Sequence, residues 1–188
     1  KLEPNDPDGV ALAPGSGPRH LAWHPCGRVV YLLGELSATV SVLGFDAGRG
    51  SLEVLQTVSA RADGACRENL AAEIAVSPDE RFLYASNRGD DDLAVFAIDG
   101  SSLQLTPIGR VPSGGRGPRS FAIDPSGRWL VAANQGSGSL VVFRLDPATG
   151  LPAATGTSVA VPDPVCVVFG PEAPARLARF GEGGSGFG

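Results

Sequence analysis

Apolar and polar positions along the chain alternate in short runs that recur as three related units. The units read RHLAWHPCGRVVYLLGELSATVSVLGFD, AEIAVSPDERFLYASNRGDDDLAVFAID and RSFAIDPSGRWLVAANQGSGSLVVFRLD. The prolines that align them, Pro25, Pro78, Pro125 and Pro171, are 53, 47 and 46 residues apart. A period of about 45–50 residues is typical of β-propeller blades rather than of helical solenoids.

Each unit contains four apolar stretches of strand length. In the first unit they lie at 21–24, 29–33, 39–46 and 51–58, and in the third at 121–124, 129–133, 140–146 and 151–161. The stretches are separated by polar turns that place Pro, and often Gly, where a tight turn needs them, as in HPCGR and DPSGR. No helical periodicity of useful length interrupts this pattern, so the sequence predicts an all-β fold.

Counting the units predicts three complete four-stranded propeller blades. A partial strand at 2–12 is expected before them, and a lone inner strand at 165–169 after them. The chain contains no methionine and begins within KLEPNDPDG, so we expect a fragment of a longer ring. Residues 1–171 are predicted to form the propeller domain, and the glycine-rich tail, 172–188, is predicted to be disordered.

The composition narrows the function classes. The 43% of hydrophobic and 19% of charged residues indicate a globular domain, and the formal net charge of −5 disfavours a general nucleic-acid binder. No apolar run approaches the length of a membrane span. Three widely spaced cysteines without a CxxC pair argue against a zinc site or a disulfide framework and favour a reducing cytoplasm. Cys166, within PVCVVF, is interpreted as a core residue.

The three blocks GPRHLAWHPCGRVVYLLGELSATVSV, AAEIAVSPDERFLYASNRGDDDLAVF and GPRSFAIDPSGRWLVAANQGSGSLVVFRLD occur in succession. Together they resemble the lactonase family of seven-bladed β-propellers, from about Leu2 to Pro171, or roughly the C-terminal half of a member. The resemblance implies hydrolysis of a sugar lactone, with 6-phosphogluconolactone as the first candidate substrate, in carbohydrate metabolism of the pentose phosphate pathway.

Candidate chemistry gathers where the first strand of each unit begins, at the expected mouth of the central channel. Stacking the units places at one position Arg19, Ala72, Arg119 and Val165, and at the next His20, Glu73, Ser120 and Cys166. Charged residues are not what a β core selects, because burying them without a partner is costly. The resemblance points to the same places, since the family's proposed catalytic His, Glu and Arg fall on His20, Glu73 and Arg119.

The expected roles follow from the chemistry of lactone hydrolysis. His20 suits proton transfer near neutral pH, and Glu73 orients it or acts as the base itself. Arg119 and Arg19 hold an anionic group or the oxyanion, and Arg67 is a further candidate for substrate binding. No metal ligand set is evident and no cofactor is expected. The carboxylate run 90–92 is interpreted as a solvated turn and His24 as a structural turn cap.

Two alternatives stay open beside a hydrolase of a small anionic sugar lactone. One is a lactonizing or isomerising enzyme that acts on a dicarboxylate such as a muconate. The other is a non-catalytic propeller that serves as an interaction scaffold. No nucleic-acid or membrane partner is expected, and the sequence leaves the oligomeric state open. A partial ring lacks much of its channel wall, so we expect these 188 residues alone to be inactive.

Overall fold

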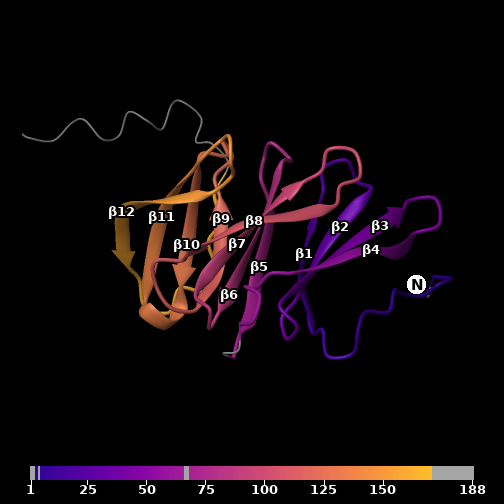
Figure 1. Ribbon diagram of the computed structural model, residues 1–188, viewed down its shortest axis with the longest axis horizontal. Coiled ribbons are helices and arrows are strands. Elements are labelled where there is room, and N and C mark those ends of the chain that lie inside the picture. The colour runs from indigo at the N-terminus through magenta and orange to yellow at the C-terminus, as the bar shows by residue number, and fades with distance from the viewer. Residues whose placement is uncertain (1–2, 4, 66–67, 171–188) are drawn as a thin grey trace, which may run out of the picture.

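The computed structural model describes residue 3 and residues 5–65 and 68–170, which form an all-β structure (Figure 1). Twelve strands make three antiparallel sheets of four strands each. The first sheet contains β1 (Pro18–Trp23), β2 (Val29–Gly34), β3 (Thr39–Asp46) and β4 (Ser51–Ser59). The second contains β5 (Leu70–Val76), β6 (Phe82–Arg88), β7 (Asp92–Ile98) and β8 (Leu105–Pro112). The third contains β9 (Pro118–Ile123), β10 (Trp129–Asn134), β11 (Ser139–Leu145) and β12 (Pro152–Ala160), with the 3₁₀ turn η1 (Gln135–Ser137) after β10.

The three sheets stand side by side in chain order. Within each sheet the hydrogen-bonded order follows the sequence, so the first and fourth strands are the two edges. The first strands pack against one another, β1 on β5 and β5 on β9. Strands β3 and β4 lie at one end of the row and β12 at the other (Figure 1). This arrangement of successive propeller blades confirms the predicted fold.

The hydrophobic core lies between the sheets and fills two separate interfaces. Strand β6 of the middle sheet contributes to both, because successive side chains of a strand point to opposite faces. Leu83 and Ala85 belong to the cluster shared with the first sheet, and Phe82 and Tyr84 to the cluster shared with the third. The middle sheet is thus covered on both faces, and its second and third strands are almost continuously buried.

The same tyrosine contact joins each sheet to the next. The Tyr31 hydroxyl donates to the Leu103 carbonyl at 3.0 Å, and the Tyr84 hydroxyl donates to the Gly150 carbonyl at 2.7 Å. Both acceptors lie in the turn between the third and fourth strands of the neighbouring sheet. Burial raises the pKa of both tyrosines well above the usual range, so both hydroxyls stay protonated donors at neutral pH.

The turn between the first and second strands recurs with one backbone conformation. Gly27 and Gly127 have φ values of 71° and 70°, in the left-handed region that glycine adopts easily. In the middle sheet Glu80 stands at this place with φ of 62°. The tight turn predicted at this place is present in all three units, and the second unit forms it with a positive φ but without glycine.

The two flanking segments differ from the prediction, because neither forms a strand within the described residues. The segment before β1 is attached by its Asn5 side chain, which donates to the carbonyls of Arg49 and Gly50. The segment 165–169 lacks a ladder because no second strand of its own sheet follows it among the described residues. For the same reason Cys166 is exposed, and its interpretation as a core residue is wrong. The predicted disordered tail, 172–188, lies outside the described residues.

Candidate active site

All three first strands carry an extra residue at the same place. In β1, Pro18 pairs with Gly34 and His20 with Leu33, which leaves Arg19 between them without a partner. In β9, Arg119 is bulged in the same way between Pro118 and Ser120. In β5 the register shifts between Ala71 and Ile74, so that two residues, Ala72 and Glu73, face one residue of β6. A β-bulge bends its strand and redirects nearby side chains, and bulges are common beside active sites.

His20 and Glu73 come together across the boundary between the first and second sheets. His20 Nδ1 lies 2.8 Å from Glu73 Oε1. The same carboxylate oxygen accepts the Ile74 N–H at 3.1 Å, and the Glu73 N–H donates to the Ser86 hydroxyl at 3.1 Å. The side chains are 43% and 22% exposed, so the pair is held by the protein and still open to a ligand. The structure thus brings together two of the predicted catalytic residues.

Ser120 of β9 extends this polar row into the third sheet. Its hydroxyl lies 3.5 Å from Glu73 Oε2, and it accepts the Val167 N–H at 3.3 Å. Ser120 itself is buried. The position after the bulge therefore holds His, Glu and Ser in three neighbouring strands, and these side chains form one connected row.

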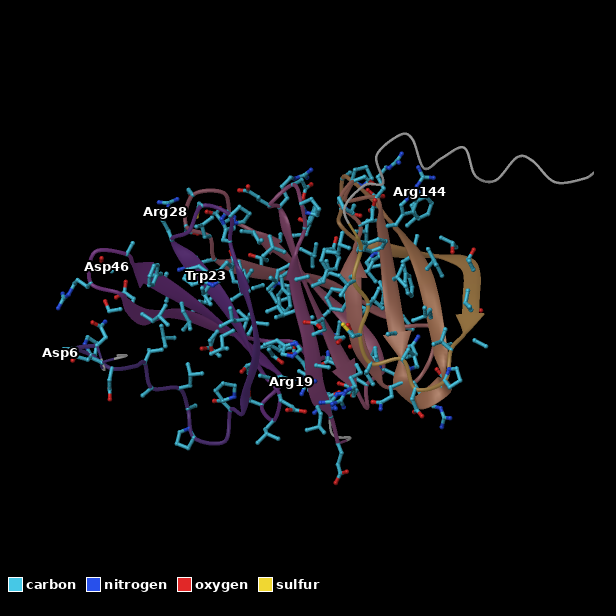
Figure 2. All side chains as sticks on the ribbon, turned by 180° about the vertical axis from the view of Figure 1, so that it is seen from behind. Asp6, Arg19, Trp23, Arg28, Asp46 and Arg144 are labelled. Atoms are coloured by element: carbon cyan, nitrogen blue, oxygen red, sulfur yellow. The ribbon has the colours of Figure 1, made fainter. Side chains whose placement is uncertain are left out.

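The two bulged arginines differ in what they contact. Arg19 donates from Nε to the Ala72 carbonyl at 2.9 Å, and its Nη1 lies 3.4 Å from Glu35 Oε2. Arg119 is half-buried, and within the described part of the chain no hydrogen bond or ion pair reaches its guanidinium. Figure 2 shows Arg19 near one end of the first sheet and Arg28, in the β1–β2 turn, near the other end. Of the two bulged arginines, Arg119 is the one that is available to an anion.

Glu35 links two arginines at this end of the sheets. Its carboxylate contacts Arg19 on one oxygen and Arg88, the last residue of β6, on the other. Arg88 also donates to the Ala71 carbonyl at 3.3 Å. The hydrogen bond from Arg88 is the main reason that the pKa of Glu35 lies below its usual value, and the charge of Arg19 adds to this.

Two other sequence predictions have clear outcomes. His24 is buried, and its Nδ1 accepts the Cys26 N–H at 3.3 Å, so its interpretation as a turn cap is confirmed. Asp124 occupies the same place in the third unit and accepts the Ser126 N–H at 3.2 Å. Arg67, predicted to bind substrate, lies outside the described residues.

The carboxylate run 90–92 is not the solvated turn that the sequence predicted. Asp90 pairs with Arg61 through two contacts of 2.7 and 2.9 Å, and the Asp90 side chain is only 13% exposed. Asp91 accepts the Gly117 N–H at 2.7 Å, and Asp92 accepts from Asn87 at 2.8 Å. Each carboxylate has a structural partner, and Asp91 ties the second sheet to the segment that enters β9.

Five cavities of the described residues lie away from the His20–Glu73 pair, since neither residue lines any of them. Within the same residues, no three His, Cys, Asp or Glu side chains gather in a way that could hold a metal ion. Nor does that part of the chain contain a helix long and apolar enough to cross a membrane.

Glu35 and Arg88 are the site-proximal residues that sequence reasoning missed. Glu35 directly follows β2 and Arg88 is the last residue of β6. Each stands ten residues after the turn proline of its unit, Pro25 or Pro78, so the two positions are equivalent in successive units. Their opposite charges at that shared position are the signal that could have indicated a contact between neighbouring blades.

Comparison with known proteins places this geometry in a family. A family model described as "Lactonase, 7-bladed beta-propeller" matches residues 1–169. The chain is 40% identical over 159 residues to a 6-phosphogluconolactonase of Bacillus subtilis, a match that covers 85% of this chain and 46% of that protein. It is 44% identical over 94 residues to a 6-phosphogluconolactonase of Pectobacterium carotovorum, which covers 49% of this chain and 28% of that protein.

Solved structures agree with these relatives. The periplasmic gluconolactonase of Pseudomonas aeruginosa superimposes with a TM-score of 0.82 at 43% identity, over 87% of this chain and 45% of that one. A protein of Lactobacillus plantarum superimposes with a TM-score of 0.80 at 35% identity, over 84% and 46%. The chain therefore spans less than half the length of the relatives that it matches.

Proposed function

The chain belongs to the lactonase family of seven-bladed β-propellers, and on this premise we propose that the complete protein that contains it hydrolyses a small sugar lactone. The observation that carries the proposal is the 2.8 Å contact between His20 of the first sheet and Glu73 of the second. Bulged arginines stand in β1, at Arg19, and in β9, at Arg119. The named relatives supply the first candidate substrates, 6-phosphogluconolactone and its unphosphorylated counterpart. Hydrolysis of the phosphorylated lactone yields 6-phosphogluconate.

The His20–Glu73 pair suits the proton transfers of this reaction. Glu73 accepts a hydrogen bond from Nδ1–H of a neutral His20, which leaves Nε2 as a base. Nε2 takes a proton from water as the water oxygen adds to the lactone carbonyl. The imidazolium then returns that proton to the ring oxygen as the carbon–oxygen bond of the ring breaks, and the carboxylate of Glu73 stabilises the charged ring in between.

Arg119 supplies the positive charge in this scheme. Its guanidinium has no partner among the described residues, so it can hold the carbonyl oxygen as negative charge develops there, or an anionic group of the substrate. Arg19 was also predicted to bind substrate, but its guanidinium contacts Glu35 and the Ala72 carbonyl. Substrate contact by Arg19 or by Arg67 stays a prediction. The scheme uses no metal ion and no cofactor.

Steady-state hydrolysis by the complete protein tests the proposal. We expect turnover of 6-phosphogluconolactone or glucono-δ-lactone above the spontaneous rate, and a fall in kcat on the order of 10²–10⁴-fold for His20→Gln and for Glu73→Gln. Glu53→Gln, which removes an exposed carboxylate from β4, is the matched control and should keep the full rate. Absence of any lactone hydrolysis would favour the scaffold function, and turnover of a muconate lactone alone would favour the dicarboxylate enzyme.

Two further parts of the proposal concern the chain alone and its location. The described residues supply His20, Glu73 and Arg119 but fewer than half the blades of a seven-bladed ring, so we expect the 188 residues alone to be inactive. We propose a cytoplasmic location, which the exposed free thiols of Cys26 and Cys166 favour. Because one structural relative is periplasmic, fractionation of the native host is the direct test.

A further inference from the structure

The bulge in β5 exposes backbone carbonyls to side chains of two sheets. The Ala71 carbonyl accepts from Arg88 at 3.3 Å, and the Ala72 carbonyl accepts from Arg19 at 2.9 Å. Both alanines are completely buried. A buried carbonyl needs a hydrogen-bond partner, and a bulge interrupts the ladder that ordinarily provides one. The two arginines therefore hold the backbone of the bulge immediately before Glu73.

Glu35 holds both of these arginines at once. Its two carboxylate oxygens contact Arg19 and Arg88, and its backbone carbonyl accepts the Ala71 N–H at 3.0 Å. The Glu35 side chain is 27% exposed and the arginine side chains 19% and 16%. We call Glu35, Arg19 and Arg88 together the Glu35 clamp. These residues hydrogen-bond to two successive residues of β5, Ala71 and Ala72.

The Glu35 clamp acts on the residue that follows the alanines. Glu73 takes its direction from the bulge, because its N–H is held by Ser86 and its carboxylate by the Ile74 N–H. A rotation of the Ala71–Ala72 backbone would move the Glu73 carboxylate away from His20. Displacements of about 1 Å in a catalytic group can cost a reaction about 100-fold.

Among the described residues, no equivalent clamp is present at the next sheet boundary. Glu35 N–H donates to the Gly17 carbonyl, and Gln135 N–H donates to the Gly117 carbonyl in the same way, so Gln135 is the counterpart of Glu35 in the third sheet. Arg88 occupies that place in the second sheet. The second boundary thus combines Arg88 with Gln135, a pair that has no carboxylate. Within the part of the chain that the structure describes, such a clamp therefore lies at the boundary that holds the His20–Glu73 pair and not at the other.

We propose that Glu35 is a positioning residue for the reaction, which acts through Arg19, Arg88 and the β5 bulge to hold Glu73 against His20. This proposal rests on the proposed function, since it takes Glu73 to be catalytic. Glu35 does not itself touch the substrate. Its loss should therefore lower kcat and leave KM nearly unchanged, because the binding of the lactone is not affected.

A double-mutant cycle on the complete protein tests this. Glu35→Gln keeps the shape of the side chain and removes its charge, and we expect kcat to fall about 10-fold with KM changed less than about 2-fold. In a Glu73→Gln background the same change should lower kcat by less than about 2-fold, because the group that Glu35 positions is already gone. Glu35→Asp keeps the charge and should restore part of the lost kcat. Glu53→Gln is again the matched control.

The outcomes separate the two proposals. If Glu73→Gln lowers kcat but Glu35→Gln lowers it equally in both backgrounds, Glu35 has only a general structural role and the positioning proposal is wrong. If Glu73→Gln leaves kcat unchanged, the catalytic role of Glu73 is wrong and the positioning proposal falls with it, whereas the proposed function fails only if the complete protein hydrolyses no lactone. Should Glu35→Gln not fold, Arg88→Gln in the same cycle removes the other side of the Glu35 clamp, and additivity there would equally overturn the proposal.

Discussion

The two boundaries between the three sheets are alike at one end of the strands and different at the other. At the end that carries the turns between the third and fourth strands, Tyr31 and Tyr84 make the same contact to the neighbouring sheet. At the end where the first strands begin, the first boundary holds the His20–Glu73 pair at 2.8 Å, whereas the second has Ser120 at 3.5 Å from Glu73.

The means of joining the sheets at this end also differ. The Glu35 clamp joins the first sheet to the second with charged side chains, whereas Asp91 joins the second sheet to the third by accepting the Gly117 N–H. Positions that repeat from unit to unit therefore assemble the blades, and positions that break the repeat carry the candidate chemistry. The three blades place different side chains, His20, Glu73 and Ser120, in one connected row, and the third unit has no histidine at either of the positions that His20 and His24 hold.

The largest expected contrast is between His20 and Ser120, which occupy the same position after the bulge in β1 and β9. His20→Gln should lower kcat on the order of 10²–10⁴-fold, since it removes the group proposed to transfer the proton. Ser120→Ala removes one weak hydrogen bond to Glu73 and should lower kcat less than about 10-fold. Equal losses in steady-state assays of the complete protein would contradict the asymmetry between the boundaries.

The second contrast is between the bulged arginines. Arg119→Lys removes the guanidinium fork that has no partner among the described residues, and KM should rise about 10-fold, a change of about 1.4 kcal/mol in binding. Arg19→Lys weakens the contact to the Ala72 carbonyl and should act on kcat, with KM changed less than about 2-fold. The KM values of both variants for a lactone test this contrast. A larger rise in KM for Arg19→Lys than for Arg119→Lys would support the prediction from the sequence that Arg19 binds substrate.

The strands and two features of the site could be predicted from the sequence, because the three repeated units can be aligned with one another. Strand positions follow from the alternation of apolar residues, and the role of His24 follows from its alignment with Ser77 and Asp124 in the same turn. The pairing of His20 with Glu73 was implied by their shared position in neighbouring units. These inferences need only the order of residues along one unit.

The bulges and the Glu35 clamp could not be read in the same way. A bulge is a difference in length between two paired strands, and the sequence alone does not show where the pairing shifts. The contact between Glu35 and Arg88 depends on how two sheets are rotated against each other, which brings turns 53 residues apart into contact. The structural use of Asp90 was hidden for the same reason, because Arg61 lies in the link between the sheets.

A smaller effect should appear equally at both boundaries. Tyr31→Phe and Tyr84→Phe keep the packed ring and leave a carbonyl of the neighbouring sheet without its donor, so each should lower the free energy of unfolding by about 1–2 kcal/mol. Urea denaturation of the complete protein measures this. A loss at one boundary and none at the other would show that the repeated contact is not equivalent in the two places.

The smallest effect separates the boundaries by pH. The Arg88 guanidinium holds the pKa of Glu35 below its usual value, so the folded state favours the ionised carboxylate. The resulting stability is complete above the unfolded pKa of about 4.3 and is lost as the pH falls through the lower, folded pKa. Glu35→Gln should therefore destabilise the protein by about 0.2–1 kcal/mol at pH 7, and by progressively less as the pH falls below about 4. Tyr84→Phe should lower the free energy of unfolding by the same amount at pH 7 and below pH 4, because the Tyr84 hydroxyl stays protonated throughout this range. Urea unfolding of both variants across this pH range measures the difference, and a cost of Glu35→Gln that does not change with pH would show that the charge of Glu35 contributes nothing to the first boundary.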